Sequence, residues 1–86
     1  MSMAKKKTVL QRPVFNKKTF LATLGSNVRE EREKQGLTQK QLAEKAGLDP
    51  STVSAIERGL REVSLNSAAR LSTALGLHLF ELTKGL

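Results

Sequence analysis

The sequence predicts an all-α fold, a compact domain of five helices. Two observations predict it: apolar residues recur at helical spacing in several segments, and glycines follow these segments where left-handed helix stops are expected. These glycines are Gly36, Gly47, Gly59 and Gly76. A chain of 86 residues allows one domain with a small core. We expect this domain at residues 17–86, after a basic arm at residues 1–16.

Residues 36–59 have the signals of two short helices joined by a tight turn. Thr38 is expected to cap the first helix by accepting from the backbone N–H of Gln41, whose side chain reaches back. Asp49 is the expected N-cap of the second helix, and Pro50 loses only an N–H that lacks a helical partner. The short turn makes the helices cross steeply, so that the second helix protrudes.

The second of these helices has two unlike faces. Val53 and Ile56 are three residues apart and are expected to face the core. The other face carries small side chains, several with hydrogen-bonding groups, at Ser51, Thr52, Ser54 and Ala55. A protruding helix with such a face fits the major groove of double-stranded DNA.

The first helix is expected over residues 17–35, with Phe20, Leu24 and Val28 on its buried stripe. Gly25 within it costs about 1 kcal/mol relative to alanine, which indicates a close approach of another helix.

The fourth helix is expected to begin near Ser64 and to end at Gly76. Its apolar stripe is predicted at Leu65, Ala68, Leu71 and Leu75. For residues 77–82 we favour a short helix, but the alternation of Leu77, His78 and Leu79 also suits a strand.

The net charge of +7 is unevenly distributed. The first 18 residues contain no acid, and the remainder is nearly neutral. Their basic residues are Lys5, Lys6, Lys7, Arg12, Lys17 and Lys18. An arm of this kind follows phosphates or enters a minor groove. The alternative is a passive tail, either solubilising or left by cloning.

Composition excludes several classes of function. The chain has no cysteine and one histidine, His78, so no metal site is predicted; His78 is expected at a cap or on the surface. No acid–base or nucleophile–base set indicates an enzyme, and no cofactor is expected. No apolar run approaches the roughly 18 residues that span a membrane, and no signal peptide is recognisable, so a cytoplasmic location is expected.

Together, these segments resemble the Cro/repressor-type (XRE-like) helix-turn-helix family of phage repressors, bacterial regulators and restriction–modification controller proteins. The resemblance covers about residues 20–82. The segments that carry it are residues 28–32, 36–39, 42–43, 47–48, 53–59 and 71–77. It implies a transcriptional regulator that binds double-stranded DNA sequence-specifically, as a homodimer on palindromic operators.

The resemblance also implies residue roles. The residue matching Gln39 bonds a phosphate and braces the recognition helix, whose first residues read bases. Here those residues are Pro50, Ser51 and Thr52, with Ser54 and Ala55 one turn further on. Many relatives have glutamine or arginine where this chain has Pro50, which lacks a side-chain donor, so direct readout should be modest and DNA shape important. Ser51 and Thr52 alternatively serve as caps.

Arg58 and Arg61 flank Gly59 in the loop where the family meets the DNA backbone. We expect phosphate contact from Arg61 rather than Arg58, with solvated surface charge as the alternative. Arg32 and Glu57 match an inward-facing ion pair of phage repressors and are expected to be structural.

The C-terminal end is expected to supply the dimer contacts, because a two-fold axis places two recognition helices about 34 Å apart. Leu79, Phe80 and Leu82 are the candidates, with core closure as their alternative role.

A second hypothesis is an antitoxin that neutralises a toxin protein and autoregulates by DNA binding; a C-terminal strand would support it. Contact of Glu62 with RNA polymerase is a weaker possibility. Single-strand and RNA binding are disfavoured because aromatic residues are few.

Overall fold

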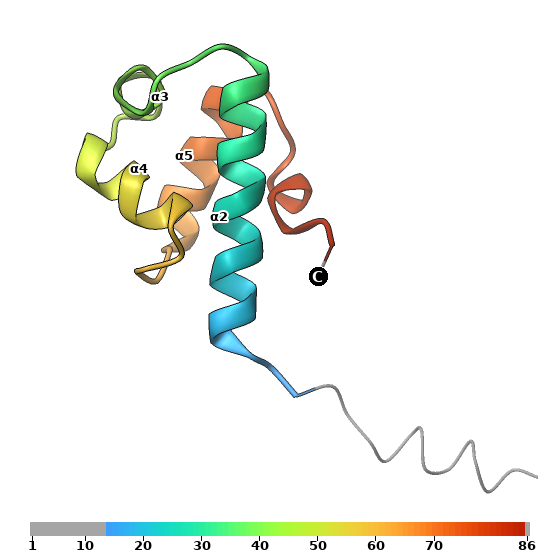
Figure 1. Ribbon diagram of the computed structural model, residues 1–86. Coiled ribbons are helices and arrows are strands. Elements are labelled where there is room, and N and C mark those ends of the chain that lie inside the picture. The colour runs from blue at the N-terminus through green and yellow to red at the C-terminus, as the bar shows by residue number, and fades with distance from the viewer. Residues whose placement is uncertain (1–13, 86) are drawn as a thin grey trace, which may run out of the picture.

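The structure is a computed structural model that describes residues 14–85 (Figure 1). These residues form four α-helices and one 3-10 helix, without strands. The elements are α2 (Lys17–Lys34), α3 (Gln39–Ala46), α4 (Pro50–Glu57), α5 (Leu65–Leu75) and η1 (Leu79–Thr83). The all-α class is confirmed, and the strand alternative at the C-terminal end is wrong because residues 79–83 are a 3-10 helix. Lys5, Lys6, Lys7 and Arg12 of the basic arm lie outside the described residues.

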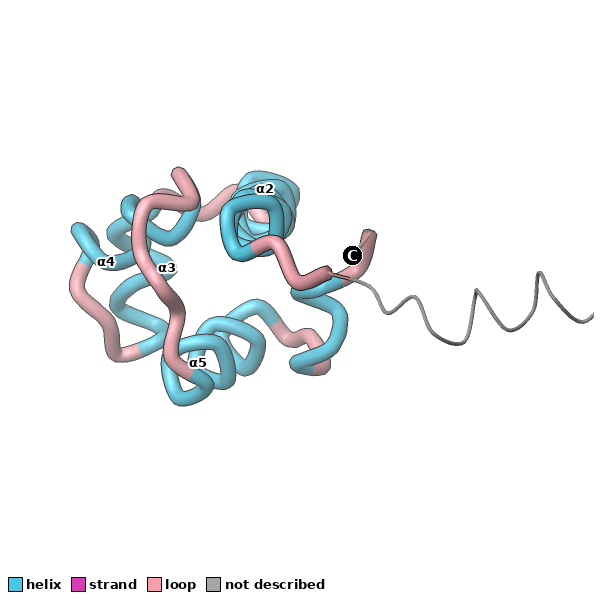
Figure 2. Tube along the Cα trace, turned by 90° about the horizontal axis from the view of Figure 1, so that it is seen from below, coloured by secondary structure: helices cyan, strands magenta, loops and turns pink. Residues whose placement is uncertain are grey.

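Helices α2 and α5 form the centre of the domain (Figures 1 and 2). Helices α3 and α4 lie to one side of this pair, and η1 lies on the other side. The core fills the space that the five elements enclose. Its buried apolar residues are Leu24, Val28, Leu42, Ala43, Ala46, Val53, Ile56, Leu71, Leu75 and Leu82.

Three expectations about apolar residues need correction. Leu65 is 74% exposed, because it stands directly after the Ser64 N-cap, where α5 has only begun to approach the core. Phe20, in the first turn of α2, is only partly buried, although it packs against the core. Leu82, a candidate for the dimer interface, is 1% exposed and closes the core within one chain.

The C-terminal turn is fastened to α2 through Asn27. Its Nδ2 donates to the carbonyl oxygen of Leu82 over 2.8 Å and to that of Lys84 over 2.9 Å. These bonds hold η1 so that the Leu82 side chain enters the core.

The capping signals are confirmed in α3 and only partly confirmed in α4. Thr38 Oγ1 accepts from the Gln41 N–H over 3.0 Å, and Gln41 Oε1 accepts from the Thr38 N–H over 2.9 Å. Asp49 is the N-cap residue of α4, but its side chain makes no capping hydrogen bond. Its backbone carbonyl accepts from Thr52 N over 2.9 Å, and the main chain thereby satisfies this donor.

Gly25 lies where α2 meets the end of α4, which confirms the predicted close approach of another helix. A Cβ at this position would overlap the carbonyl oxygen of Ile56 and lie 2.9 Å from that of Glu57. The missing side chain therefore lets the α2 backbone rest directly on the last turn of α4.

We expect Gly25→Ala to destabilise the fold by about 2 kcal/mol, since overpacking against backbone outweighs the helix propensity gained. Denaturant unfolding measures this. Ser26→Ala, at an exposed neighbouring position, is the control and should stay within about 0.5 kcal/mol of the parent. Equal stability of both variants would contradict the close packing.

Candidate nucleic-acid interface

Helix α4 lies at the outer edge of the domain with one face on the core (Figure 1). Val53 and Ile56 are fully buried on the inner face. Ser51 is exposed on the outer side, and the other three predicted base readers, Thr52, Ser54 and Ala55, remain partly accessible. All four side chains therefore keep some accessible surface.

A buried ion pair joins α2 to the end of α4. Arg32 Nε donates to Glu57 Oε2 over 2.7 Å, and Nη2 donates to Oε1 over 3.0 Å. The third nitrogen, Nη1, donates to the carbonyl oxygen of Leu37 over 2.7 Å. The side chains are 11% and 2% exposed, and the hydrogen bonds with Glu57 raise the pKa of Arg32 above its ordinary value. The geometry agrees with the expected inward-facing pair.

Gln39 adds α3 to the same network. Its Nε2 donates to Glu57 Oε1 over 3.0 Å, on the oxygen that also accepts from Arg32. Gln39 therefore braces α4, whereas its phosphate contact stays a prediction. Its bond to Glu57 was not predicted from the sequence, because the two residues are 18 positions apart.

The loop after α4 carries two arginines in different settings. Arg61 Nη1 donates to Thr52 Oγ1 over 3.3 Å, so it lies over the first turns of α4. Arg58 is exposed, and within residues 14–85 its side chain makes no hydrogen bond or ion pair. Arg61 thus lies beside a predicted base reader, a contact that the sequence analysis missed.

The same loop is paired with the start of α2. Lys17 Nζ lies 2.7 Å from Glu62 Oε2 in an exposed ion pair. The hydrogen bond from Lys17 lowers the pKa of Glu62 below its ordinary value. The two residues are 45 positions apart, so no local spacing signalled their contact.

Residues 14–85 have the features of neither a metal site nor a membrane span. This part of the chain holds no cluster of three or more side chains suited to a metal ion. It also holds no helix with the length and apolar character needed to cross a bilayer.

A two-helix unit with a protruding second helix is the arrangement of helix-turn-helix proteins. The sequence profile of the helix-turn-helix family HTH_3 matches residues 28–82. The chain belongs to this family. It is an XRE-type family of DNA-binding transcriptional regulators, and the predicted resemblance is confirmed.

Three similar proteins show the extent of the likeness. An uncharacterized HTH-type transcriptional regulator of Methanothermobacter thermautotrophicus is 45% identical over 49 residues, which cover 57% of this chain and 71% of that protein. A hypothetical transcription factor of Neisseria meningitidis is 36% identical over 61 residues, covering 71% of this chain and 58% of the relative. The crystal structure of the restriction–modification controller protein C.AhdI from Aeromonas hydrophila has a TM-score of 0.71 at 45% identity, covering 72% and 94% of the two chains.

We expect Glu57→Ala to destabilise the HTH_3 fold by about 3–5 kcal/mol, because Arg32 then keeps a largely buried charge without its partner. Replacing Arg32 and Glu57 together by methionine and leucine should cost clearly less than Glu57→Ala, since no charge is left unpaired and only the Gln39 amide and the Leu37 carbonyl lose a partner. Thermal and denaturant unfolding measure both. Exposed Glu44→Ala is the control, because within residues 14–85 the Glu44 side chain makes no ion pair or hydrogen bond. A Glu57→Ala variant as stable as the parent would contradict a structural role for the pair.

Proposed function

We propose that this protein binds double-stranded DNA sequence-specifically as a homodimer on palindromic operators, with α4 in the major groove. One observation carries the proposal: α4 leaves its polar N-terminal half accessible while the buried Arg32–Glu57–Gln39 network fixes its other end. A reading helix must present side chains in a fixed orientation, because each base contact depends on hydrogen-bond geometry.

The names of the relatives support a regulatory role. The relative from Methanothermobacter thermautotrophicus is called a transcriptional regulator, and C.AhdI is called a restriction–modification controller protein. We propose that this chain likewise controls transcription. Repression and activation are both compatible with such an activity.

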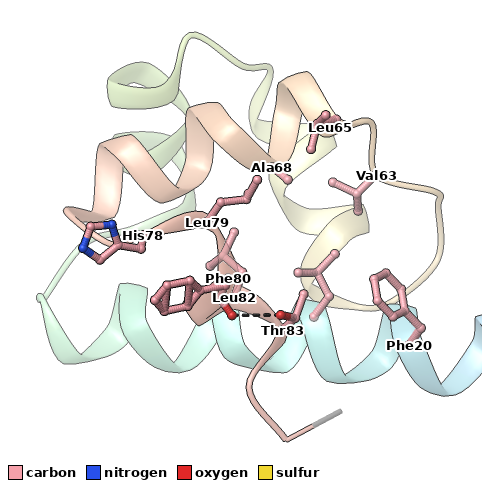
Figure 3. A pocket seen from close by; sticks show the side chains of 10 residues that line it. Phe20, Val63, Leu65, Ala68, His78, Leu79, Phe80, Leu82 and Thr83 are labelled. Carbon is pink, nitrogen blue, oxygen red and sulfur yellow. Dashed lines mark hydrogen bonds between the residues drawn. The ribbon is translucent and has the colours of Figure 1, made fainter.

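An apolar surface formed by η1 and the start of α5 supports homodimer formation. Leu65, Leu79 and Phe80 are 74%, 39% and 70% exposed there and border a groove of about 640 Å³ (Figure 3). Because η1 and α4 lie on opposite sides of the α2–α5 pair, a two-fold contact here leaves both reading helices free (Figure 2). Leu79 and Phe80 remain proposed dimer residues. Leu65 joins them, and the buried Leu82 is no longer proposed.

The antitoxin hypothesis gains no support from the described residues. Its sequence basis was a C-terminal strand, and that segment is the 3-10 helix η1. Glu62, proposed for polymerase contact, is paired with Lys17 on the surface. Neither a toxin nor RNA polymerase is therefore part of the proposed mechanism.

Selection of binding sites from random duplex DNA tests the proposed function. The expected result is a palindromic consensus whose half-sites are centred about 34 Å, one helical turn, apart. The pool should be carried through a parallel selection without protein as a control. A pool that shows no enrichment over that control would contradict sequence-specific binding, and a single asymmetric half-site would contradict the dimer.

We expect Phe80→Ser to weaken dimerisation at least about fivefold without unfolding the chain, since a large aromatic side chain in an interface accounts for about 1 kcal/mol or more. Sedimentation at several concentrations measures the monomer–dimer equilibrium. Leu60→Ser, at a 63% exposed apolar residue of the α4–α5 loop, is the matched control. An equilibrium changed equally by both variants would argue against the η1 surface.

The basic arm gives a test that concerns phosphates alone. Deleting residues 1–14 removes Lys5, Lys6, Lys7 and Arg12. If all four neutralise phosphates, the slope of log affinity against log salt should flatten by about 3.6 units per arm, at roughly 0.9 per contact. The affinities for specific and for random DNA should fall about equally. Coincident slopes for the full-length and shortened chains would show the arm to be a passive tail.

A further inference from the structure

Thr52 and Arg61 form a pair at the accessible end of α4. Arg61 Nη1 donates to Thr52 Oγ1 over 3.3 Å. The hydroxyl therefore accepts from a cation, while its own proton is still available to a further acceptor. No protein acceptor takes that proton within the part of the chain that the structure describes.

The outward-facing groups of this pair are hydrogen-bond donors. A guanidinium has five N–H donors and no acceptor. A hydroxyl that accepts from a charged donor becomes polarised and donates more strongly, because hydrogen bonds in a chain reinforce one another. The nearby positive charge also disfavours the approach of a second donor. The pair thus matches a partner that offers acceptors.

The loop that carries Arg61 is held on α2 at both sides of this residue. Gly59, at φ 68°, packs so closely on α2 that a Cβ would lie 3.2 Å from Ala22 Cα. On the other side, Glu62 is paired with Lys17 over 2.7 Å. Arg61 therefore extends from a short, anchored segment, which limits the positions that its guanidinium can reach.

We propose that Arg61 holds the Thr52 hydroxyl as a donor, and that the two side chains together read a guanine in the operator half-site. Guanine offers two adjacent acceptors, N7 and O6, in the major groove. Adenine combines an acceptor with a donor, cytosine offers a donor, and thymine has one acceptor beside a methyl group. The pair supplies the donors that Pro50 lacks. This inference rests on the proposed DNA binding and adds the base that is read.

The experiment starts from the operator selected with the wild-type chain. Affinities are measured for the wild type, for Thr52→Val, Thr52→Ser and Arg61→Met, and for the double variant that combines Thr52→Val with Arg61→Met. The DNAs carry each of the four base pairs, or 7-deazaguanine in place of guanine, at every half-site position in turn. Thermal midpoints confirm that each variant is folded.

We expect wild type to prefer guanine about tenfold or more at one half-site position. Thr52→Val and Arg61→Met should each remove most of this preference, and the double variant should lose no more than either single variant, because both act on one contact. Thr52→Ser, which keeps the hydroxyl, should retain the preference. Loss of guanine N7 in 7-deazaguanine should weaken wild type and leave Thr52→Val unaffected.

Arg58→Met is the matched control, since Arg58 is an exposed arginine of the same loop without the contact to Thr52. Arg58→Met should lower the affinity for all DNAs by the same factor and leave the base preference unchanged. The pairing is overturned if Arg61→Met behaves in this same uniform way, if Arg58→Met also removes the guanine preference, or if the Thr52-dependent position prefers another base. A wild-type chain that binds no DNA selectively would instead overturn the proposed function, and this inference with it.

Discussion

The arrangement of α2, α3 and α4 depends on one buried carboxylate, that of Glu57. It stands in the last turn of α4 and accepts from Arg32 on α2 and from Gln39 on α3. A buried charge that loses its partners is costly, so these hydrogen bonds resist any movement that separates the helices. The helix that is proposed to read DNA is thus fixed by polar geometry at the end away from its accessible residues.

Backbone packing at Gly25 acts together with this network. The α2 backbone rests on the carbonyl oxygens at the end of α4, while Val53 and Ile56 fill the core below. Apolar burial alone tolerates small rotations, because it has little directional preference. Directional hydrogen bonds and a backbone contact supply the orientation that burial leaves open.

Much of the fold was predictable because its signals are local. The Thr38–Gln41 capping box and the helix-ending glycines depend on residues a few positions apart, and the structure confirms them. The Arg32–Glu57 pair followed from family resemblance. The Lys17–Glu62 and Arg61–Thr52 contacts were missed, because they depend on the path of the α4–α5 loop over α2. Leu65 was placed in the core because periodicity identifies a face but not how far the neighbouring element covers it. For Leu82 the alternative role, core closure, is the one that the structure shows.

The separation of the two faces of α4 affects how such a protein can evolve. Ser51 and Ser54 contribute no side chain to the fully buried core, whereas Val53, Ile56 and Glu57 hold the helix in place. Substitutions on the outer face would therefore change the proposed base readers at little cost in folding. After a gene duplication, two copies of such a chain would diverge into regulators that ignore each other's sites while keeping the same interior. The small domain thus allows new regulatory circuits to arise by changes at a few surface positions.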